Sequence, residues 1–322
     1  MPTTVYFATN RTVNGSPANW RNYGTSIVTP SDPAALTYAT AFVDNTNLTA
    51  DTTGLIQSIH NVQRGGFSAE AATDISAPGR NLLVFIHGFD NSFEAAITRA
   101  AFNREWLAQS GVAAADTTVV AFSWPSLGQL LAPPLLTTAY RHDQTMAGLS
   151  GLHLMSFFAN LLPLVQQARA SGHRIFLIAH SMGNWALQAA VESWFSHGNG
   201  GADFFDEAIL AAADEVYDTF DYPFPGRLSG LPYLARRIST YFSGADQVLA
   251  VSMAINLGAK RLGQAGPHDR FNTTKFPPLR YRMVDCGFYR DYSYDFASSH
   301  QYYRRSPGVR ADIAALMGAG SA

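Results

Sequence analysis

Short, mainly apolar runs alternate with longer amphipathic stretches along this chain. The short runs are rich in β-branched residues and stop at turn-forming residues, which is typical of β-strands. Several, such as residues 82–86, are continuously apolar rather than alternating, which favours strands buried on both faces of a parallel sheet. We expect strands at residues 3–9, 36–43, 82–86, 117–122, 174–179, 208–213, 237–242 and 279–284.

Helical stretches separate these strands and cover residues 92–109, about 137–169, 184–195 and 247–262. Ser92 begins the first as an N-cap, and Gly172 follows the second as a stop. Alternating strands and helices predict an α/β fold with a mostly parallel central sheet and helices on both of its faces. No linker interrupts the alternation. We therefore expect residues 1–322 to form one domain, with a small cap possible at about 215–236.

Reactive residue types follow the ends of the expected strands, where open α/β sheets bind their ligands. Ser181 lies between a buried strand and a helix, in Ala179-His-Ser-Met-Gly183. This setting is typical of a nucleophile elbow, a sharp turn whose usual pattern is G-x-S-x-G. Small residues are required there because strand and helix approach closely, and Ala179 keeps that steric logic. The alternative interpretation is a plain strand–helix connection with a serine cap.

Four motifs together resemble a known group of proteins. They are Ala179-His-Ser-Met-Gly183, His87-Gly-Phe-Asp90, Ser123-Trp-Pro125 and the opening Phe7-Ala-Thr-Asn-Arg11. From about Val5 to about Tyr303 the chain resembles the bacterial α/β-hydrolases classed as a domain of unknown function. The resemblance implies the α/β-hydrolase fold, a Ser–His–acid triad and no cofactor. It implies no substrate, because fold does not fix function.

In related lipases and esterases, an oxyanion-hole loop follows the third strand of the fold, which is the position of His87-Gly-Phe-Asp90 here. We expect the N–H groups of Phe89 and Met182 to be its two donors. Losing one such donor typically raises the barrier by about 3 kcal/mol. The alternative is a strand-end turn capped by Asp90. Trp124 is expected to shape the pocket wall, while Tyr140 and Asp143 are assigned equally to the pocket and to the surface.

The general base must be one of nine histidines. Most lie inside the motifs above, within the long helical stretch or at the ends of elements. His268 and His300 remain in the C-terminal third, where an α/β-hydrolase carries its histidine. His300 lies in a loop after the last strand and matches the position that the resemblance implies. We therefore expect His300 to be the base and His268 to be a surface-loop residue.

Two aspartates compete to be the acid of the triad. Asp214 follows the strand at 208–213, and Asp246 follows the strand at 237–242. In most such enzymes the acid follows the later strand, which favours Asp246. Aspartate is also a good N-cap, so Asp246 could instead begin the helix near Gln247, and the two roles are compatible. Glu215 and Asp218 are weaker candidates.

Composition excludes several other classes of protein. The net charge is −2 without basic clusters, which argues against a nucleic-acid surface. Cys286 is the only cysteine, and no metal-ligand spacing or phosphate-binding glycine loop is present, so we expect no metal and no cofactor. The start lacks the features of a signal peptide, and the longest apolar stretch favours a buried helix. We expect a cytoplasmic protein without stable membrane insertion; the oligomeric state stays open.

These observations predict a serine esterase that forms an acyl-enzyme on Ser181, with His300 as base and Asp246 as acid. Aromatic residues gather in two segments, 217–236 and 288–296, which suggests a small-molecule ester with an apolar or aromatic part. An amidase or a lipase would use the same triad. A protein of another class, a catalytically silent binding module, is disfavoured by the presence of all three triad residue types.

Overall fold

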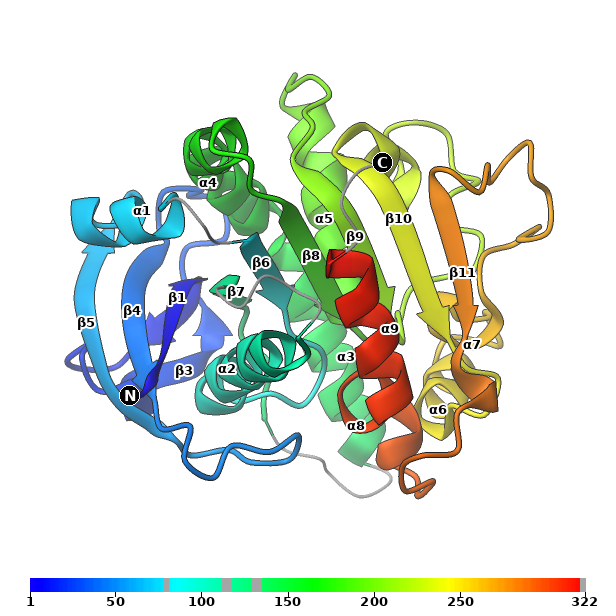
Figure 1. Ribbon diagram of the computed structural model, residues 1–322, viewed down its shortest axis with the longest axis horizontal. Coiled ribbons are helices and arrows are strands. Elements are labelled where there is room, and N and C mark those ends of the chain that lie inside the picture. Colours follow the sequence, from blue (N-terminus) through cyan, green and yellow to red (C-terminus); the bar gives the residue numbers. More distant parts are fainter. Residues whose placement is uncertain (78–80, 112–116, 129–134, 319–322) are drawn as a thin grey trace.

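The computed structural model describes residues 1–77, 81–111, 117–128 and 135–318. Its main sheet consists of β1 (Thr3–Thr9), β4 (Thr37–Val43), β5 (Ile56–Arg64), β6 (Asn81–Ile86), β7 (Thr117–Ser123), β8 (Ile175–His180), β9 (Phe205–Ala211), β10 (Ala235–Phe242) and β11 (Tyr281–Asp285). The strand order is β11-β10-β9-β8-β6-β7-β1-β4-β5 (Figure 1). Neighbours from β11 to β1 pair in parallel, whereas β4 pairs antiparallel with β1 and with β5.

Helices cover both faces of this sheet (Figure 1). One face packs against α1 (Ala69–Ile75), α3 (Leu135–Leu149), α4 (Gly151–Ala170) and α5 (Gly183–Ser196). The other packs against α2 (Phe93–Gln109), α8 (Tyr302–Arg305) and α9 (Pro307–Gly318). Two short helices, α6 (Gln247–Ile255) and α7 (Leu262–Ala265), follow β10. A separate hairpin joins β2 (Arg11–Val13) to β3 (Tyr23–Ile27).

The continuous apolar run of β6 follows from these two covered faces. Leu82, Val84 and Ile86 point into the core beneath α4 and α5. Leu83 and Phe85 point into the core beneath α2 and α9. Successive side chains of a strand point to opposite faces, so a strand with helices on both sides is apolar at every position. The mostly parallel α/β sheet expected from the sequence is confirmed.

Two expected helices are broken in the structure. The stretch at 137–169 divides into α3 and α4, which bend by 43°. Gly151 begins α4 in close contact with α5, where an added Cβ would lie 2.6 Å from the Cβ of Ala189. The stretch at 247–262 ends at Ile255, because Leu257 and Gly258 adopt positive φ angles of 58° and 82°. Sequence reasoning did not predict β2, β3, β5, α1, α8 or α9.

Among the described residues no single helix is both long and apolar enough to cross a membrane. Only α3 and α4 taken together reach that length and apolarity, across their bend.

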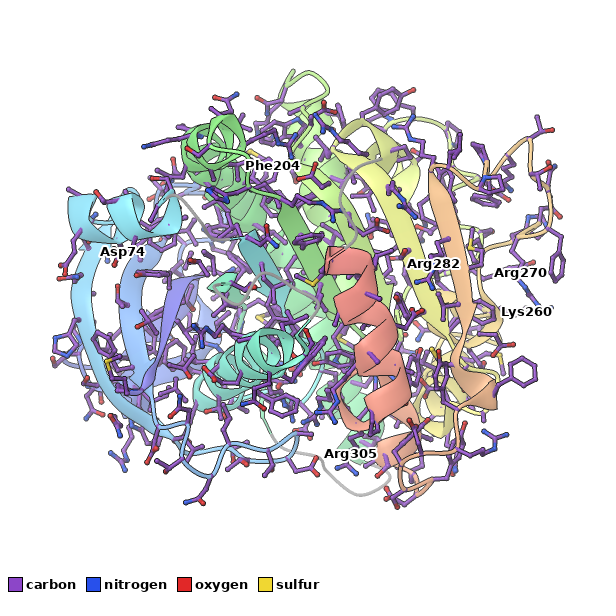
Figure 2. All side chains as sticks on the ribbon, in the orientation of Figure 1. Asp74, Phe204, Lys260, Arg270, Arg282 and Arg305 are labelled. Atoms are coloured by element: carbon purple, nitrogen blue, oxygen red, sulfur yellow. The ribbon has the colours of Figure 1, made fainter. Side chains whose placement is uncertain are left out.

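The C-terminal helix is fixed to the edge of the sheet. Arg282 lies on β11 (Figure 2). It forms two hydrogen bonds with Asp312 on α9, of 2.7 and 2.5 Å. The hydroxyl of Tyr241 on β10 donates to the same carboxylate at 2.6 Å. Bidentate arginine–carboxylate pairs constrain orientation as well as distance. The segment between β11 and α9, which carries His300, is therefore held from its C-terminal side.

Candidate active site

Ser181 lies in a tight turn between β8 and α5. Its φ of 54° is in the left-handed region, which is uncommon for a residue with a side chain. An added Cβ at Gly183 would lie 2.5 Å from the carbonyl oxygen of His87, so only glycine fits there. Asn184 stabilises the turn by donating to the carbonyls of Ala179 and Ser181. This geometry projects the serine hydroxyl beyond the end of the strand, as in a nucleophile elbow.

Ser181, His300 and Asp246 form an unbroken hydrogen-bonded chain. The Oγ of Ser181 lies 2.8 Å from Nε2 of His300, and Nδ1 of that ring lies 2.7 Å from Oδ2 of Asp246. A carboxylate accepts only, so Nδ1 carries the proton and Nε2 accepts from the serine hydroxyl. All three side chains are buried. The structure thus brings together the three residues selected from the sequence.

Asp246 uses its two oxygens for different purposes. Oδ2 bonds to His300, while Oδ1 accepts the backbone N–H of Leu249 at 2.9 Å. The second contact makes Asp246 the N-cap of α6. The helix cap is therefore compatible with the contact to His300, and it fixes the carboxylate relative to the ring.

Asp214 belongs to a different network on the same side of the sheet. Its carboxylate accepts the hydroxyls of Tyr140 at 2.8 Å and Ser252 at 2.5 Å. The buried guanidinium of Arg261 lies 3.5 Å from Oδ1. Burial and the charge of Asp214 raise the pKa of Tyr140, so this phenol stays protonated and donates. Glu215 pairs with Arg227 at 2.7 Å. Among the described residues, the carboxylates of Asp214 and Glu215 therefore have partners other than His300.

The loop after β6 lies against Ser181. An added Cβ at Gly88 would be 2.6 Å from the Cβ of Ser181. Within the described ranges, the backbone N–H groups of Phe89 and Met182 donate to no protein acceptor. Buried N–H groups are normally paired. These two are therefore available to a ligand beside the serine, as an oxyanion hole requires.

His87 and Trp124 hold this loop in place. Nε2 of His87 accepts the backbone N–H of Trp124 at 3.1 Å, so the proton sits on Nδ1, which donates to the carbonyl of Gly88 at 2.9 Å. The indole of Trp124 donates to the carbonyl of His87 at 2.7 Å and stacks on its ring. Burial lowers the pKa of His87 well below its ordinary value, which keeps the ring neutral. Trp124 was expected to shape the pocket wall, but it is not among the residues that line the pocket. Its contacts hold the loop after β6 instead.

Arg11 ties three chain segments together at the same edge of the sheet. Its buried guanidinium donates to the carbonyls of Asn91 at 2.7 Å and Ser126 at 3.1 Å, and to the hydroxyl of Ser123 at 3.0 Å. Asn91 and Ser126 belong to the loops after β6 and β7, and Ser123 is the last residue of β7. Burial lowers the pKa of Arg11 to about 9, against the attraction of Asp143. The opening motif therefore supports the loop that carries Phe89.

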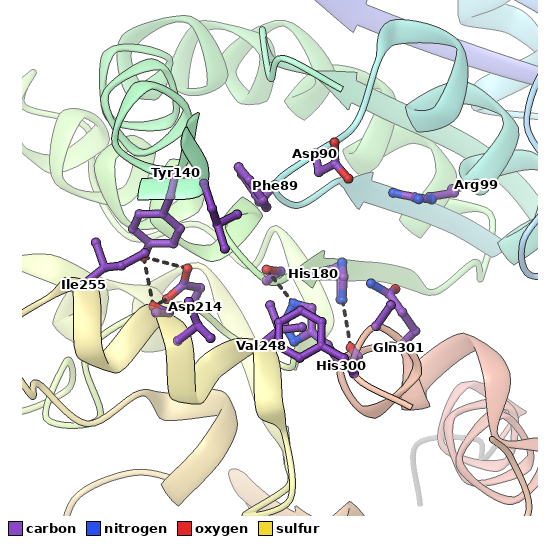
Figure 3. A pocket seen from close by; sticks show the side chains of 16 residues that line it. Phe89, Asp90, Arg99, Tyr140, His180, Asp214, Val248, Ile255, His300 and Gln301 are labelled. Carbon is purple, nitrogen blue, oxygen red and sulfur yellow. Dashed lines mark hydrogen bonds between the residues drawn. The ribbon is translucent and has the colours of Figure 1, made fainter. Parts of the chain in front are cut away.

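A pocket of about 760 Å³, including its open mouth, contains Ser181 and His300 in its wall (Figure 3). Of the two expected oxyanion-hole residues, Phe89 lines the pocket, whereas the side chain of Met182 is fully buried at the start of α5. Tyr140, for which the sequence allowed a position in the pocket or on the surface, lines the pocket. Asp143 is fully buried, so neither residue has a surface role. The apolar wall consists of Phe89, Leu136, Val248, Val251, Ile255 and Phe296.

The segment at 215–236, considered as a possible cap, contributes no residue to the wall of this pocket. It packs on α5 instead, where an added Cβ at Gly230 would lie 2.7 Å from the ring of Phe195. His268 is half-exposed and pairs with Asp221 at 2.6 Å, away from Ser181. Sequence reasoning missed Arg99 and Gln301, which also line the pocket. Within the described ranges, no three His, Cys, Asp or Glu side chains are placed to hold a metal ion.

The fold and the geometry of this site define the chain as an α/β-hydrolase. It belongs to the family described as alpha/beta hydrolase of unknown function (DUF900), whose model matches residues 65–318. No curated protein and no solved structure matches the chain significantly. The resemblance noted in the sequence is confirmed, although the match begins after the opening motif that ends at Arg11. Membership of this family supports a hydrolase and leaves the substrate open.

Proposed function

We propose that this chain is a serine hydrolase that cleaves carboxylic esters through an acyl-enzyme on Ser181. The hydrogen-bonded chain from Ser181 through His300 to Asp246, in the wall of a pocket, carries the proposal. A serine hydroxyl is a weak nucleophile and needs an adjacent base that a third group orients. Here the elbow presents the hydroxyl, His300 accepts from it, and Asp246 holds the ring.

In the acylation step, Oγ of Ser181 bonds to the ester carbonyl carbon while His300 takes the hydroxyl proton on Nε2. The carbonyl π electrons move to the oxygen, whose negative charge accepts hydrogen bonds from the N–H groups of Phe89 and Met182. The intermediate then collapses, the bond to the leaving oxygen breaks, and His300 returns the proton to that oxygen. An alcohol leaves, and the acyl group remains on Ser181.

In the deacylation step, a water molecule replaces the alcohol beside His300. His300 takes one proton from this water as its oxygen bonds to the acyl carbon, and a second oxyanion forms. Collapse breaks the bond to Ser181, whose oxygen regains the proton from His300, and a carboxylic acid leaves. Asp246 keeps the Nδ1 proton in place in both steps and stabilises the imidazolium.

The test uses purified protein and measures hydrolysis of matched esters and amides that share short acyl groups, and of emulsified long-chain esters. We expect ester turnover that Ser181→Ala abolishes and that Ser193→Ala, further along α5 and outside the pocket, leaves in place. Faster turnover of the matched amides would make the chain an amidase, and turnover confined to emulsified long-chain esters would make it a lipase. Turnover of none of these by folded protein would favour a silent binding module.

A further inference from the structure

The pocket around Ser181 has two unlike ends. Tyr140 and Ile255 lie at one end, and Asp90 and Arg99 lie at the other, with His300 between them (Figure 3). Val248 and Val251 add apolar side chains to the pocket wall, and Asp214 and Ser252 lie beside Tyr140 with their polar groups bonded to one another. Most small-molecule pockets place a few polar groups where they fix the orientation of a ligand. An arginine inside a pocket is therefore informative about the ligand.

Arg99 has unused donor capacity. It lies on α2, and its Nη1 donates to the side chain of Asn91, which holds the guanidinium in position. Nε is buried without a hydrogen-bond partner among the described residues. The carboxylate of Asp90 faces the same end of the pocket, yet these two side chains form no ion pair in the part of the chain that the structure describes. Burial outweighs the attraction of Arg99 and raises the pKa of Asp90 to about 6.

Gln301 supplies a second donor at this end. Nε of Arg304 donates to its Oε1 at 2.8 Å, so the side-chain oxygen is occupied. Within the part of the chain that the structure describes, the NH₂ group of the amide has no acceptor, and Gln301 lies in the pocket wall directly after His300 (Figure 3).

Two guanidinium groups, those of Arg99 and Arg304, lie near this end, which the carboxylate of Asp90 also faces. Arg304 is buried, and its pKa is lowered to about 10 by burial and by the nearby charge of Arg99. The carboxylate that reaches Arg304 is that of Asp51, at 3.7 Å, and it also pairs with Arg305 at 2.6 Å. Asp51 is solvent-exposed, so water screens its charge. An anion in the pocket would relieve the repulsion between the half-buried guanidinium of Arg99 and the buried guanidinium of Arg304.

We propose that the esters cleaved at Ser181 carry a carboxylate, which binds Arg99 and the amide of Gln301, together with an apolar part that lies against Val248 and Ile255. This inference rests on the proposed function and names the class of its substrate. A planar guanidinium matches the geometry of a carboxylate and forms charge-assisted hydrogen bonds with it.

The experiment compares each carboxylate ester with an isostere in which an isopropyl group replaces the carboxylate. One pair has the group on the acyl part, as para-nitrophenyl monoadipate, and the other has it on the alcohol part, as the butyrate ester of glycolate. The measured quantity is the ratio of kcat/KM between charged and neutral members. In at least one pair we expect a ratio above one that Arg99→Gln lowers by about tenfold or more, equivalent to about 1.4 kcal/mol.

Three further variants keep the result interpretable. Arg99→Lys retains a cation and should recover part of the ratio, whereas Gln301→Glu introduces an opposing charge and should lower it. Arg64→Gln removes an exposed arginine on β5, at the far edge of the sheet, and should leave the ratio as in the wild type. A preference for the neutral esters in both pairs, unchanged by Arg99→Gln, would overturn the inference while leaving an esterase. Failure to hydrolyse any ester would instead count against the proposed function.

Discussion

Replacing Asp246 by asparagine separates its two structural roles. Asparagine is as good an N-cap as aspartate, so its oxygen can still accept the N–H of Leu249, and the free energy of unfolding should change by only a few tenths of a kcal/mol. Its NH₂ group, however, would face Nδ1 of His300. That nitrogen would then have to accept, which moves the ring proton to Nε2 and prevents His300 from taking the proton of Ser181.

The expected loss is large. In the serine-protease triad the same wrong tautomer lowers kcat by about 10⁴, which corresponds to about 5 kcal/mol of transition-state stabilisation. Asp246→Ala should lose the cap as well and cost about 1 kcal/mol of stability in addition to activity. The assay is ester hydrolysis under saturating substrate, with urea unfolding of each variant measured in parallel.

Asp214→Asn is the matched comparison and should show the opposite pattern. Asp214 accepts two hydroxyls and lies beside the buried Arg261. Asparagine would remove the charge 3.5 Å from that guanidinium and leave one hydroxyl without an acceptor, which costs about 1–3 kcal/mol of stability. Because Asp214 does not contact His300, kcat should fall far less than in Asp246→Asn. A dead Asp214→Asn beside a nearly normal Asp246→Asn would refute this assignment of the acid.

Two further predictions test the supports of the site. Trp124→Phe removes the indole hydrogen bond to the carbonyl of His87, which should loosen the loop that carries Phe89 and lower kcat more than it raises KM; unchanged kcat would contradict this role. Burial raises the pKa of Glu215 from 4.5 to about 7, so the folded state holds this proton more tightly than the unfolded state. Its stabilising effect is present below pH 4.5 and is lost as pH rises towards 7. Urea unfolding should therefore show that the free energy of unfolding of Glu215→Gln, relative to that of the wild type, rises by up to about 3 kcal/mol between pH 4.5 and 7. A difference that stays constant over this interval would contradict the prediction.

Much of the fold could be predicted because its signals are local. Continuous apolar runs such as 82–86 follow directly from strands with helices on both faces, and Ser92 caps α2 through its own side chain, as expected. The bend between α3 and α4 could not be predicted, since it depends on the close contact of Gly151 with Ala189 on α5. Whether residues 215–236 form a cap or pack on the body of the protein could not be predicted, because an aromatic segment gives no indication of which surface it covers.

Some residues of the candidate site could likewise be predicted from local sequence, and others could not. Ser181 is marked by its immediate neighbours, while His300 and Asp246 were selected by chain order and by resemblance to a family. Arg99 carried no signal in the sequence, because a lone arginine on a helix is usually solvated. Only the folded chain places it beside the loop after β6 and the turn that contains His300. Long-range proximity of this kind cannot be derived from periodicity or spacing.

Covalent labelling by a fluorophosphonate tests the central claim most directly, because only an activated serine reacts rapidly with it at neutral pH. Peptide mapping by mass spectrometry should find one adduct, on Ser181, in the folded wild-type protein. His300→Ala, which removes the base 2.8 Å from Oγ, should slow the labelling strongly while the protein remains folded. No adduct in folded protein, or an adduct on another residue, would contradict the account.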